Sequence, residues 1–426
     1  MIVKISPSIA NGKIKAPPSK SMAHRLLISA ALSEGKSQIK QIDLSEDIRA
    51  TLNCLEGLGA QYSLENDVIK IRGIKLDTNS AYNLNKETQP QKLDCNESGS
   101  TLRFLIPIAL LFNKPVIFQG KKRLFERPLS VYEDIFLKDP EIQFNKSENE
   151  IFVKGYLKSD DYKIPGDISS QFITGLLFAL PTLNNNSSSI QIKAPIESLS
   201  YLLLTLDALK AFGIQIELEP NKINPDKDLL LTIPGRQKYQ AGIHTVEGDY
   251  SNAAFFSALN YLRSDNKVEV TNLRESSLQG DKVFPEIFNK LASAKDENTI
   301  ISLADCPDLA PIAFTVAAAL NGAIFTDTKR LAIKESDRAK VMAMELEKFG
   351  AKILVEENQV TIKRANLSKP KQALFGHNDH RIVMSLAILA SLYGGTIEGA
   401  AAINKSFPDF FKVLANCGID IEIVEE

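Results

Sequence analysis

Residues 334–355 read KESDRAKVMAMELEKFGAKILV, an amphipathic helical pattern that stops at a glycine and passes into an alternating strand. Apolar side chains recur three and four residues apart up to Gly350, which is the spacing of one helix face, and glycine commonly ends helices. The same plan appears at residues 43–64, 196–218 and 406–423, with looser copies at 127–144 and 278–293. The chain therefore carries six copies of a helix–turn–strand phrase.

A second helical phrase, more apolar and rich in alanine, alternates with the first. Its openings fall near Ser19, Ser98, Ser169, Asp249, Asp308 and Asp379. A helix that is apolar nearly all round must be buried, whereas its amphipathic partner can face solvent. Because each buried phrase is followed by a β-rich stretch, the sequence predicts six α/β units, each with a buried and an exposed helix.

Composition excludes several classes of protein. The 426 residues hold 50 Lys and Arg against 52 Asp and Glu, and this net charge of −2 argues against a sequence-independent grip on nucleic acid. No apolar run reaches the roughly 18 residues of a membrane span, and no secretory signal opens the chain. The four cysteines form no CxxC pair and are too few for a disulfide framework. We therefore expect a cytoplasmic protein without membrane or nucleic-acid partners.

The first residues of the buried helices are polar, charged and different in each copy. Ser and Asp at these positions suit helix N-caps, and for Ser19, Ser98 and Asp249 capping explains the residue as well as a binding site would. Lys20, Arg25 and Arg381 would oppose the positive end of the helix dipole, so they require an anion such as phosphate or carboxylate. The amphipathic helices add further polar residues, namely Arg127, Ser198, Tyr201, Lys334, Glu335, Ser336, Asp337, Arg338 and Lys405. If the helices start on the same side, these groups converge on one electropositive cleft.

Competing motifs do not fit. The EGKS at 34–37 lacks the upstream glycine of a phosphate-binding P-loop, since residue 30 is Ala. His377 and His380 have no HExxH companion, so we expect no metal. Gly57 and Gly59 end a helix instead of opening one, which excludes a dinucleotide fingerprint.

Taken together, the helix openings resemble a known family, the 5-enolpyruvylshikimate-3-phosphate synthases. PPSKSMAHR at 17–25 is similar to the family's PGSKSxxNR, SGSTLRF at 98–104 to its AGTxxR segment, and RLAIKESDR at 330–338 to its RVKExDR signature. SSQF, VEGDYS, QGD, NDHR and KSFPDF resemble its remaining blocks in order. The resemblance covers nearly the whole chain, and its strength lies in the co-occurrence of these motifs.

The resemblance implies a two-domain inside-out α/β barrel, built from six repeated α/β units, three per domain, with a cleft between the domains. One discontinuous domain would comprise residues 1–18 and 240–426, and the inserted domain residues 19–239. The substrates would bind between the domains, which close on them.

The resemblance also implies the reaction. The family transfers the enolpyruvyl group of phosphoenolpyruvate to the 5-hydroxyl of shikimate 3-phosphate, by addition and then elimination of phosphate. Asp308 would take the hydroxyl proton, and Glu335 or Lys20 would protonate the methylene carbon. Sequence does not decide between those two acids.

The binding residues follow motif by motif. Those implied for shikimate 3-phosphate are Lys20, Ser21, Arg25, Ser169, Ser170, Gln171, Ser198, Tyr201, Asp308 and Lys334. Those implied for phosphoenolpyruvate are Lys20, Gly99, Arg127, Gln171, Arg338, Arg381 and Lys405. Each substrate carries a carboxylate and a phosphate, so several cations are needed, and Arg supplies the bidentate fork. The missing side chain of Gly99 would leave room for phosphoenolpyruvate and for glyphosate, the family's inhibitor.

The chain departs from the family pattern in three places. His24 stands where the family has Asn, Ala332 stands where its signature has Arg, with Arg330 two residues earlier, and Leu199-Ser200 replaces a basic residue and a proline. These differences affect secondary contacts and leave the main set of site residues intact.

Two rival functions remain to be compared. A UDP-N-acetylglucosamine enolpyruvyl transferase should carry a reactive cysteine in a glycine-rich loop before an Arg-Pro, and here KKRLFE precedes Arg127-Pro128. A non-enzymatic repeat scaffold should have interchangeable residues at corresponding positions, whereas this chain has different chemistry at each. We expect an enzyme that needs no cofactor and works as a monomer.

Overall fold

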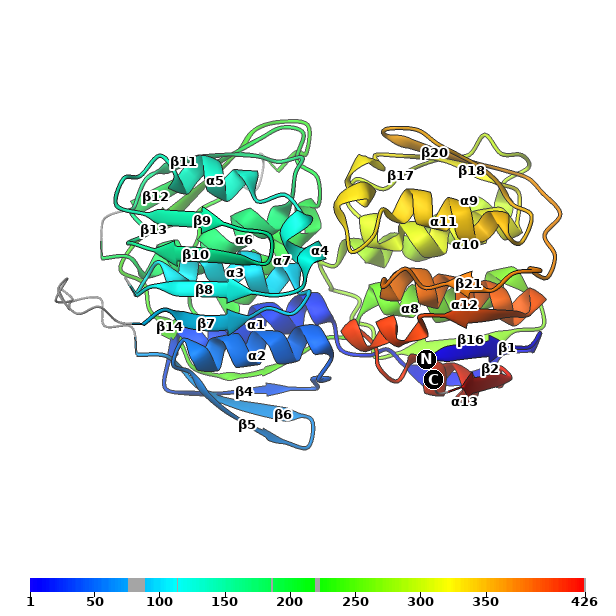
Figure 1. The fold of residues 1–426 in the computed structure, drawn as a ribbon, viewed down its shortest axis with the longest axis horizontal. Coiled ribbons are helices and arrows are strands. Elements are labelled where there is room, and N and C mark those ends of the chain that lie inside the picture. Colours follow the sequence, from blue (N-terminus) through cyan, green and yellow to red (C-terminus); the bar gives the residue numbers. More distant parts are fainter. Residues whose placement is uncertain (76–88, 113, 185–186, 219–222, 425–426) are drawn as a thin grey trace. The chain divides into compact units, whose positions relative to one another are not determined.

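The computed structural model describes residues 1–75, 89–112, 114–184, 187–218 and 223–424 (Figure 1). The chain forms two compact units. The terminal unit comprises Met1–Ser19 and Glu247–Glu426, and the insert unit comprises Lys20–Val246.

The insert unit contains seven helices within its described residues. They are α1 (Lys20–Leu32), α2 (Glu46–Gly57), α3 (Gly99–Ala109), α4 (Lys122–Glu126), α5 (Ser130–Phe136), α6 (Ser170–Ala179) and α7 (Leu199–Ala211), with the short 3₁₀ helix η1 (Leu180–Thr182) after α6. Its strands are β3 (Ser33–Glu34), β4 (Lys36–Lys40), β5 (Gln61–Glu65), β6 (Val68–Arg72), β7 (Gln91–Asp94), β8 (Val116–Gln119), β9 (Gln143–Lys146), β10 (Glu150–Lys154), β11 (Asp161–Pro165), β12 (Ser187–Lys193), β13 (Leu229–Pro234), β14 (Tyr239–Gln240) and β15 (Ile243–Thr245). They form sheets in the orders β7-β8-β10-β9, β11-β12-β13, β15-β4-β6-β5 and β14-β3.

The terminal unit repeats this plan. Its helices are α8 (Tyr250–Leu262), α9 (Phe284–Ser293), α10 (Ala310–Ala319), α11 (Arg338–Glu347), α12 (His380–Tyr393) and α13 (Phe410–Asn416), with 3₁₀ helices η3 (Gly280–Val283), η4 (Pro307–Leu309), η5 (Lys329–Ile333) and η6 (Ala400–Lys405). Its strands are β1 (Ile2–Ile5), β2 (Asn11–Lys15), β16 (Lys267–Thr271), β17 (Ile300–Ser302), β18 (Ala323–Thr326), β19 (Lys352–Val355), β20 (Gln359–Lys363), β21 (Leu374–Phe375), β22 (Gly395–Glu398) and β23 (Ile421–Val424). The sheet orders are β21-β22-β1-β23, β17-β18-β20-β19 and β16-β2.

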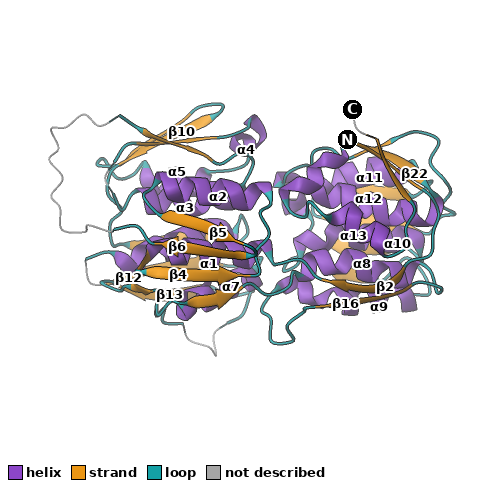
Figure 2. Cartoon of the chain, turned by 90° about the horizontal axis from the view of Figure 1, so that it is seen from below, coloured by secondary structure: helices purple, strands orange, loops and turns teal. Residues whose placement is uncertain are grey.

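The alanine-rich phrases form the inner helices, as the sequence predicts. In α1 every residue from Met22 to Leu32 is buried, and in α12 every residue from His380 to Ser391. Within the insert unit α3 packs on α6, and within the terminal unit α10 packs on both α8 and α12. In Figure 2, β10 of the insert unit lies to one side of α3 and α5, and β2 and β16 of the terminal unit lie to one side of α8. Inner helices covered by outer sheets confirm the expected α/β class with two domains.

Four of the inner helices, α3, α6, α10 and α12, each connect two parallel strands of their own unit. β7 and β8, joined through α3, pair in parallel, and so do β11 and β12 through α6, β17 and β18 through α10, and β21 and β22 through α12. In a parallel β–α–β connection the helix begins at the carboxyl end of the first strand. The polar opening residues of these helices therefore lie at the carboxyl ends of the strands that precede them.

The boundaries between the units differ from the predicted ones. β15 pairs in parallel with β4, and β14 pairs with β3, so residues 240–246 belong to the insert unit and not to the terminal domain. Likewise β2 pairs with β16 in the terminal unit, and the first crossing falls after Ser19. A strand before each crossing thus stays in the unit that the chain is leaving. The expected strand after α7 is also missing from the described residues, where Glu217 makes only an isolated bridge to Thr232.

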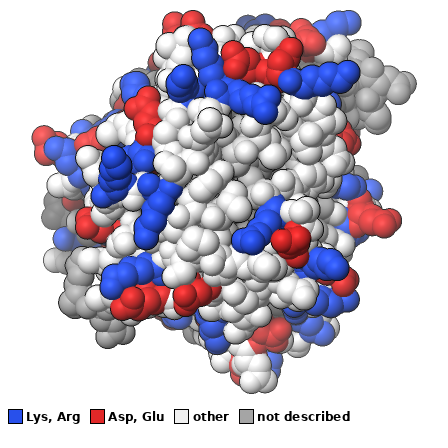
Figure 3. Space-filling model, turned by 90° about the vertical axis from the view of Figure 1, so that its right-hand side faces the viewer, with Lys and Arg blue, Asp and Glu red and all other residues white. Residues whose placement is uncertain are grey.

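The surface carries both signs of charge. On the side of the terminal unit that lies at the right of Figure 1, Lys and Arg alternate with Asp and Glu around a region without charged side chains (Figure 3). None of the described helices is long and apolar enough to cross a membrane.

Candidate active site

Four of the six predicted helix openings are side-chain caps. The side chains of Ser98, Ser169, Asp249 and Asp379 accept hydrogen bonds from backbone N–H groups in the first turns of α3, α6, α8 and α12. These bonds satisfy donors that the helix itself leaves unpaired. Asp308 does something else. It lies in η4, two residues before α10 begins at Ala310, and Leu309 occupies the cap position.

Three cations surround the Asp308 carboxylate. Its Oδ1 accepts from Arg338 Nη1 at 2.8 Å and from Lys334 Nζ at 3.2 Å, and its Oδ2 accepts from Arg381 Nη2 at 2.9 Å. Lys334 precedes α11, Arg338 opens it, and Arg381 lies in the first turn of α12. The carboxylate therefore joins the starts of three helices of the terminal unit.

The same cluster contains two further carboxylates. Arg338 is 1% exposed and donates through Nε to Asp379 Oδ2 at 2.9 Å and through Nη2 to Glu335 Oε2 at 2.7 Å. All three nitrogens of this guanidinium thus bind carboxylates, which fixes its orientation. Lys405, the last residue of η6, donates from Nζ to the carbonyl of Asn378 at 2.6 Å, which brings it to the start of α12.

The charged groups of this cluster shift one another's pKa values. Burial alone would raise the pKa of Asp308, but Arg381, Lys334 and Arg338 hold that pKa well below its usual value. For Arg338, burial opposes the charge while Asp379, Glu335 and Asp308 raise the pKa. Burial lowers the pKa of Lys334 in spite of Asp308. Asp308 is therefore firmly ionised at neutral pH in the absence of substrate.

Sequence reasoning missed the carboxyl group of Asp281 in this cluster. Asp281 is buried, and burial together with Asp308 raises its pKa to about 7 while Arg381 opposes the shift. Arg381 also donates to the hydroxyl of Ser251 and to the Asp308 carbonyl. The QGD block contains Asp281, so the signal was present, but a single Asp in a turn has no pattern that reveals burial.

In the insert unit, Lys20 binds a carboxylate of the protein itself. Its Nζ lies 2.8 Å from Asp47 Oδ2, and both side chains are largely buried. Arg381 is likewise balanced by Asp308. The expectation that cations at these helix starts require a ligand anion is therefore incomplete, because local carboxylates already compensate the two charges.

Arg25 is held by its surroundings. It is the sixth residue of α1, beyond the first turn where the sequence placed it, and it donates through Nε to Thr205 Oγ1, through Nη1 to the Ser21 carbonyl and through Nη2 to the Tyr201 carbonyl. Burial lowers its pKa to about 10. Ser21, Arg25 and Tyr201 are thus brought together, with Ser198 directly before α7 at a φ of 60°.

Arg127 has a different environment. The residue is 7% exposed, and its Nε has no hydrogen-bond partner among the residues that the structure describes. It packs against Gly99, where an added Cβ would lie 2.5 Å from Nη1. An added Cβ at Gly99 would therefore displace the Arg127 guanidinium. A buried guanidinium of this kind suits an anionic ligand.

Gln171, another residue predicted for the site, makes two side-chain contacts in the insert unit. Arg103 Nη1 donates to Gln171 Oε1 at 2.6 Å, and Gln171 Nε2 donates to Ser100 Oγ at 3.0 Å. Ser169 caps α6, and Ser170 is its first helical residue. Arg103 was seen in the sequence but not assigned to the site, because a buried Arg one turn into a helix has no distinct pattern.

His24, one of the departures from the family pattern, is a buried structural residue. Its Nδ1 lies 2.8 Å from Thr51 Oγ1, which lies 2.6 Å from Thr101 Oγ1, which donates to Ser98 Oγ. This chain of polar atoms joins α1, α2 and the cap of α3. Burial, with Lys20 and Arg25, lowers the pKa of His24 well below its usual value.

The predicted residues thus form groups within each unit. In the terminal unit these are Asp308, Lys334, Glu335, Arg338 and Arg381, with Lys405 at the start of α12. In the insert unit Lys20 pairs with Asp47, Gly99 lies against Arg127, Gln171 contacts Arg103, and Ser21, Arg25 and Tyr201 meet. No group of three or more His, Cys, Asp and Glu in the described part of the chain is arranged to hold a metal ion.

Comparison with known proteins finds matches along nearly the whole chain. The family described as EPSP synthase (3-phosphoshikimate 1-carboxyvinyltransferase) matches residues 6–414. A 3-phosphoshikimate 1-carboxyvinyltransferase of Clostridioides difficile is 39% identical over 96% of each chain, and one of Clostridium acetobutylicum is 40% identical over 98% of each. A solved EPSP synthase from Acinetobacter baumannii superposes with a TM-score of 0.76 at 22% identity over the full length of both chains.

Proposed function

The chain belongs to the EPSP synthase family, and we propose that it transfers the enolpyruvyl group of phosphoenolpyruvate to the 5-hydroxyl of shikimate 3-phosphate. The 5-oxygen bonds to C2 of phosphoenolpyruvate while C3 gains a proton. C3 then loses a proton, the C2–O bond to phosphate breaks, and phosphate leaves. The reaction is a step of the shikimate pathway, which leads to chorismate and the aromatic amino acids.

The Asp308 cluster is the observation that carries this proposal. A carboxylate with three cationic partners, in a chain that matches the family over residues 6–414, supplies both a base and the binding groups for an anion. A repeat scaffold without a catalytic role has no need for such a cluster. A buried ionic cluster destabilises the fold when one of its charges lacks a partner.

Asp308 accepts the proton of the 5-hydroxyl. A base whose pKa is far below neutral is ionised but weak, and Asp308 has that property while Arg381, Lys334 and Arg338 hold it. A substrate carboxylate or phosphate that binds the same cations competes for their positive charge. The pKa of Asp308 then rises toward the range in which it can accept a proton, so substrate binding activates the base.

Two side chains remain candidates for protonating C3. Lys20 Nζ lies beside Asp47, and Glu335 lies beside Arg338. Lys20 belongs to the insert unit and Glu335 to the terminal unit. Both have a hydrogen-bonded partner that orients the group, so the structure favours neither of them.

Both units supply groups for the two substrates. Each substrate carries roughly −2.5 to −3 charge at neutral pH, so several cations are needed. Arg127, Arg338, Arg381 and Lys405 bind phosphoenolpyruvate together with Lys20, Gly99 and Gln171. Ser21, Arg25, Ser169, Ser170, Ser198, Tyr201 and Lys334 bind shikimate 3-phosphate, with Lys20, Gln171 and Asp308. The buried guanidinium of Arg127 supports the first set most directly.

We further propose that the enzyme works as a cytoplasmic monomer and that glyphosate competes with phosphoenolpyruvate. The negative charges of glyphosate suit the same cations. The absence of a membrane-length helix among the described helices is compatible with this location.

Phosphate release by the purified protein tests the function. Phosphoenolpyruvate is supplied with shikimate 3-phosphate in one reaction and with UDP-N-acetylglucosamine in another. We expect phosphate only with shikimate 3-phosphate. Release only with the sugar nucleotide would identify the sister transferase, and release with neither acceptor would contradict the proposal.

A further inference from the structure

A buried carboxyl group lies in α11 outside the cluster around Asp308. Glu345 is 1% exposed and is near the end of the helix that Arg338 opens. The proposed reaction does not use this residue. A buried carboxylate is costly unless its oxygens are hydrogen-bonded and its charge is compensated, so the partners of Glu345 indicate what it does.

Glu345 joins α11 to the chain before α12. Lys348, directly after α11, compensates the charge, since its Nζ lies 3.0 Å from Oε1 and 2.8 Å from Oε2. Oε2 also accepts from the backbone N–H of Phe375 at 2.9 Å, and Oε1 lies 2.8 Å from His377 Nε2. Phe375 ends β21, and His377 lies in the turn between β21 and α12. The carboxylate thus fastens this turn to α11.

The turn has an uncommon backbone conformation. The φ angles of His377 and Asn378 are 46° and 52°. Two successive non-glycine residues with positive φ persist only where their surroundings hold them. The backbone before and after them is hydrogen-bonded, because Gly376 N–H donates to the Glu398 carbonyl and Asp379 N–H to the Gly376 carbonyl. At the turn itself, the contact of His377 with Glu345 supplies the side-chain support.

The same turn orients three cations of the proposed active site. The Asn378 carbonyl accepts from Lys405 Nζ at 2.6 Å. The next residue, Asp379, accepts from Arg338 Nε at 2.9 Å and from the backbone N–H of Arg381 at 3.0 Å. A shift of the turn would move the carbonyl and the carboxylate that hold these groups. Small displacements of binding groups weaken the binding of a ligand that needs all of them at once.

From these contacts we propose that Glu345 and His377 are positioning residues for phosphoenolpyruvate. This inference rests on the function proposed above. Neither residue needs to touch the substrate, since Glu345 holds His377 and the turn then fixes the partners of Lys405 and Arg338. The effect should be selective, because Lys405, Arg338 and Arg381 all belong to the set proposed for phosphoenolpyruvate and not to the set proposed for shikimate 3-phosphate.

Two substitutions of His377 separate the side-chain contact from the backbone preference. In His377→Gln the amide nitrogen can replace Nε2 as the donor to Glu345. In His377→Asn the side chain is too short to reach, although Asn adopts positive φ more readily than Gln. The backbone preference alone therefore favours the Asn variant, whereas the contact favours the Gln variant.

Steady-state kinetics, with each substrate varied at saturation of the other, measure the difference. We expect the Michaelis constant for phosphoenolpyruvate to rise at least about tenfold in His377→Asn and no more than about twofold in His377→Gln. The constant for shikimate 3-phosphate should change less than about twofold in either variant. A merely structural role would change both constants together, or lower only the melting temperature.

Glu345→Gln tests the other side of the contact. The amide offers one acceptor where the carboxylate offers two, so Phe375 N–H or His377 loses its partner. We expect the Michaelis constant for phosphoenolpyruvate to rise at least about fivefold. The melting temperature should also fall, because Lys348 loses its counter-charge.

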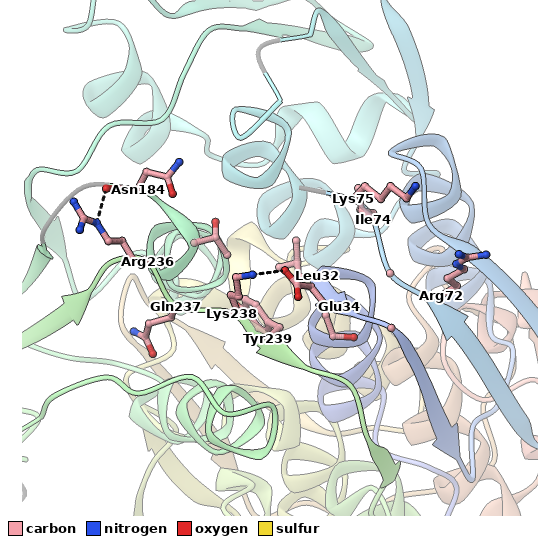
Figure 4. Close-up of a pocket in the computed structure, with 14 residues that line it drawn as sticks. Leu32, Glu34, Arg72, Ile74, Lys75, Asn184, Arg236, Gln237, Lys238 and Tyr239 are labelled. Carbon is pink, nitrogen blue, oxygen red and sulfur yellow. Dashed lines mark hydrogen bonds and ion pairs between the residues drawn. The ribbon is translucent and has the colours of Figure 1, made fainter. Parts of the chain in front are cut away.

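Glu34→Gln is the matched control. It removes an exposed ion pair with Lys238, at 2.8 Å, far along the chain from the turn. Figure 4 shows this pair beside a cavity of the insert unit. Both Michaelis constants and the melting temperature should equal those of the unaltered protein, since exposed ion pairs contribute little to stability.

Several results would overturn the inference in an active enzyme. These are equal constants for phosphoenolpyruvate in the two His377 variants, a larger rise in His377→Gln than in His377→Asn, an equal rise for both substrates, and an unchanged constant in folded Glu345→Gln. If Glu345→Gln does not fold, the His377 variants decide, because that side chain is partly exposed. Absence of transferase activity in the unaltered protein would instead contradict the proposed function, and the role assigned to the two residues with it.

Discussion

At the scale of single residues, the partners of Asp308 differ from those of a helix cap. The sequence suggested that it caps the helix after Pro307, but its carboxylate binds Arg338, Lys334 and Arg381 instead. Asn at this position keeps the size of the side chain and removes the charge. The role as a base and the role as a structural anion can then be measured separately.

We expect Asp308→Asn to lower turnover by roughly 100-fold or more, because the amide cannot accept the hydroxyl proton. Thermal stability should also fall, since three buried or half-buried cations lose a partner. Steady-state kinetics, titration with shikimate 3-phosphate and a melting curve measure the three effects. Asp420→Asn, an exposed residue of the same unit, is the control. A fully active Asp308→Asn enzyme would remove this residue from the mechanism.

Gly99 owes its identity to Arg127. An added Cβ would lie 2.5 Å from Nη1 and 2.9 Å from Cζ of that side chain, so Arg127 must move. We expect Gly99→Ala to raise the Michaelis constant for phosphoenolpyruvate and to raise the inhibition constant of glyphosate further, because the longer inhibitor tolerates less loss of space. Inhibition kinetics on both proteins measure the two constants.

A matched glycine separates this effect from general damage. A Cβ on Gly395 would make only ordinary contacts, at 3.4 Å or more, so Gly395→Ala should leave both constants unchanged. The hypothesis is falsified if both constants rise equally in Gly99→Ala, or if neither changes while the melting temperature shows an intact fold.

The raised pKa of Asp281 predicts that the free energy of unfolding depends on pH. Its pKa is about 7 in the folded protein, raised by burial and by Asp308, and near 3.9 when unfolded. Between these values the folded state binds more protons, so this carboxyl lowers stability as pH rises from about 4 to about 7. Asp281→Asn removes that loss, and its stability relative to the unaltered protein should grow with pH over this window. Urea unfolding at pH 5, 6, 7 and 8 measures it. A difference that is the same at every pH would refute the assignment.

At the scale of helices and strands, His24 links three helices through Thr51 and Thr101. Burial keeps this ring neutral, and its pKa lies below the unfolded value of about 6.5. The unfolded chain therefore binds more protons below pH 6.5, and stability falls as pH is lowered from there.

We expect His24→Asn, which restores the family's usual residue, to reduce this acid sensitivity. Asn can still offer a polar atom to Thr51 but does not titrate. Urea midpoints at pH 7.5 and 5.5 should differ less in the variant than in the unaltered protein. An equal or larger difference would show that His24 is not the titrating group.

The elements also show what a sequence can and cannot reveal. The inner helices were predictable, because α1, α10 and α12 are apolar nearly all round beyond their polar first turns, and such helices must be buried. The assignment of β15 was not, because its partner β4 lies some 200 residues earlier and local pattern carries no pairing information. Charge compensation was equally hidden, since Asp47 meets Lys20 only through the packing of α2 on α1.

At the scale of the whole molecule, the proposed reaction uses residues from both compact units. Lys20, Arg127 and Gln171 belong to the insert unit, and Asp308, Arg338 and Arg381 to the terminal unit. Family membership predicted the residue types at these positions. The proposed chemistry is an addition followed by an elimination, and this sequence of steps leaves a trace in the product.

Reaction in D₂O gives the most direct measurement of the central claim. Purified protein, phosphoenolpyruvate and shikimate 3-phosphate are incubated, phosphorus NMR follows phosphate, and mass spectrometry follows the product. If C3 is protonated to a methyl group and then loses a hydrogen, the enol ether methylene acquires deuterium while one phosphate is released for each shikimate 3-phosphate consumed. Phosphate release without a new enol ether, or a product methylene free of deuterium, would contradict transfer by addition and elimination.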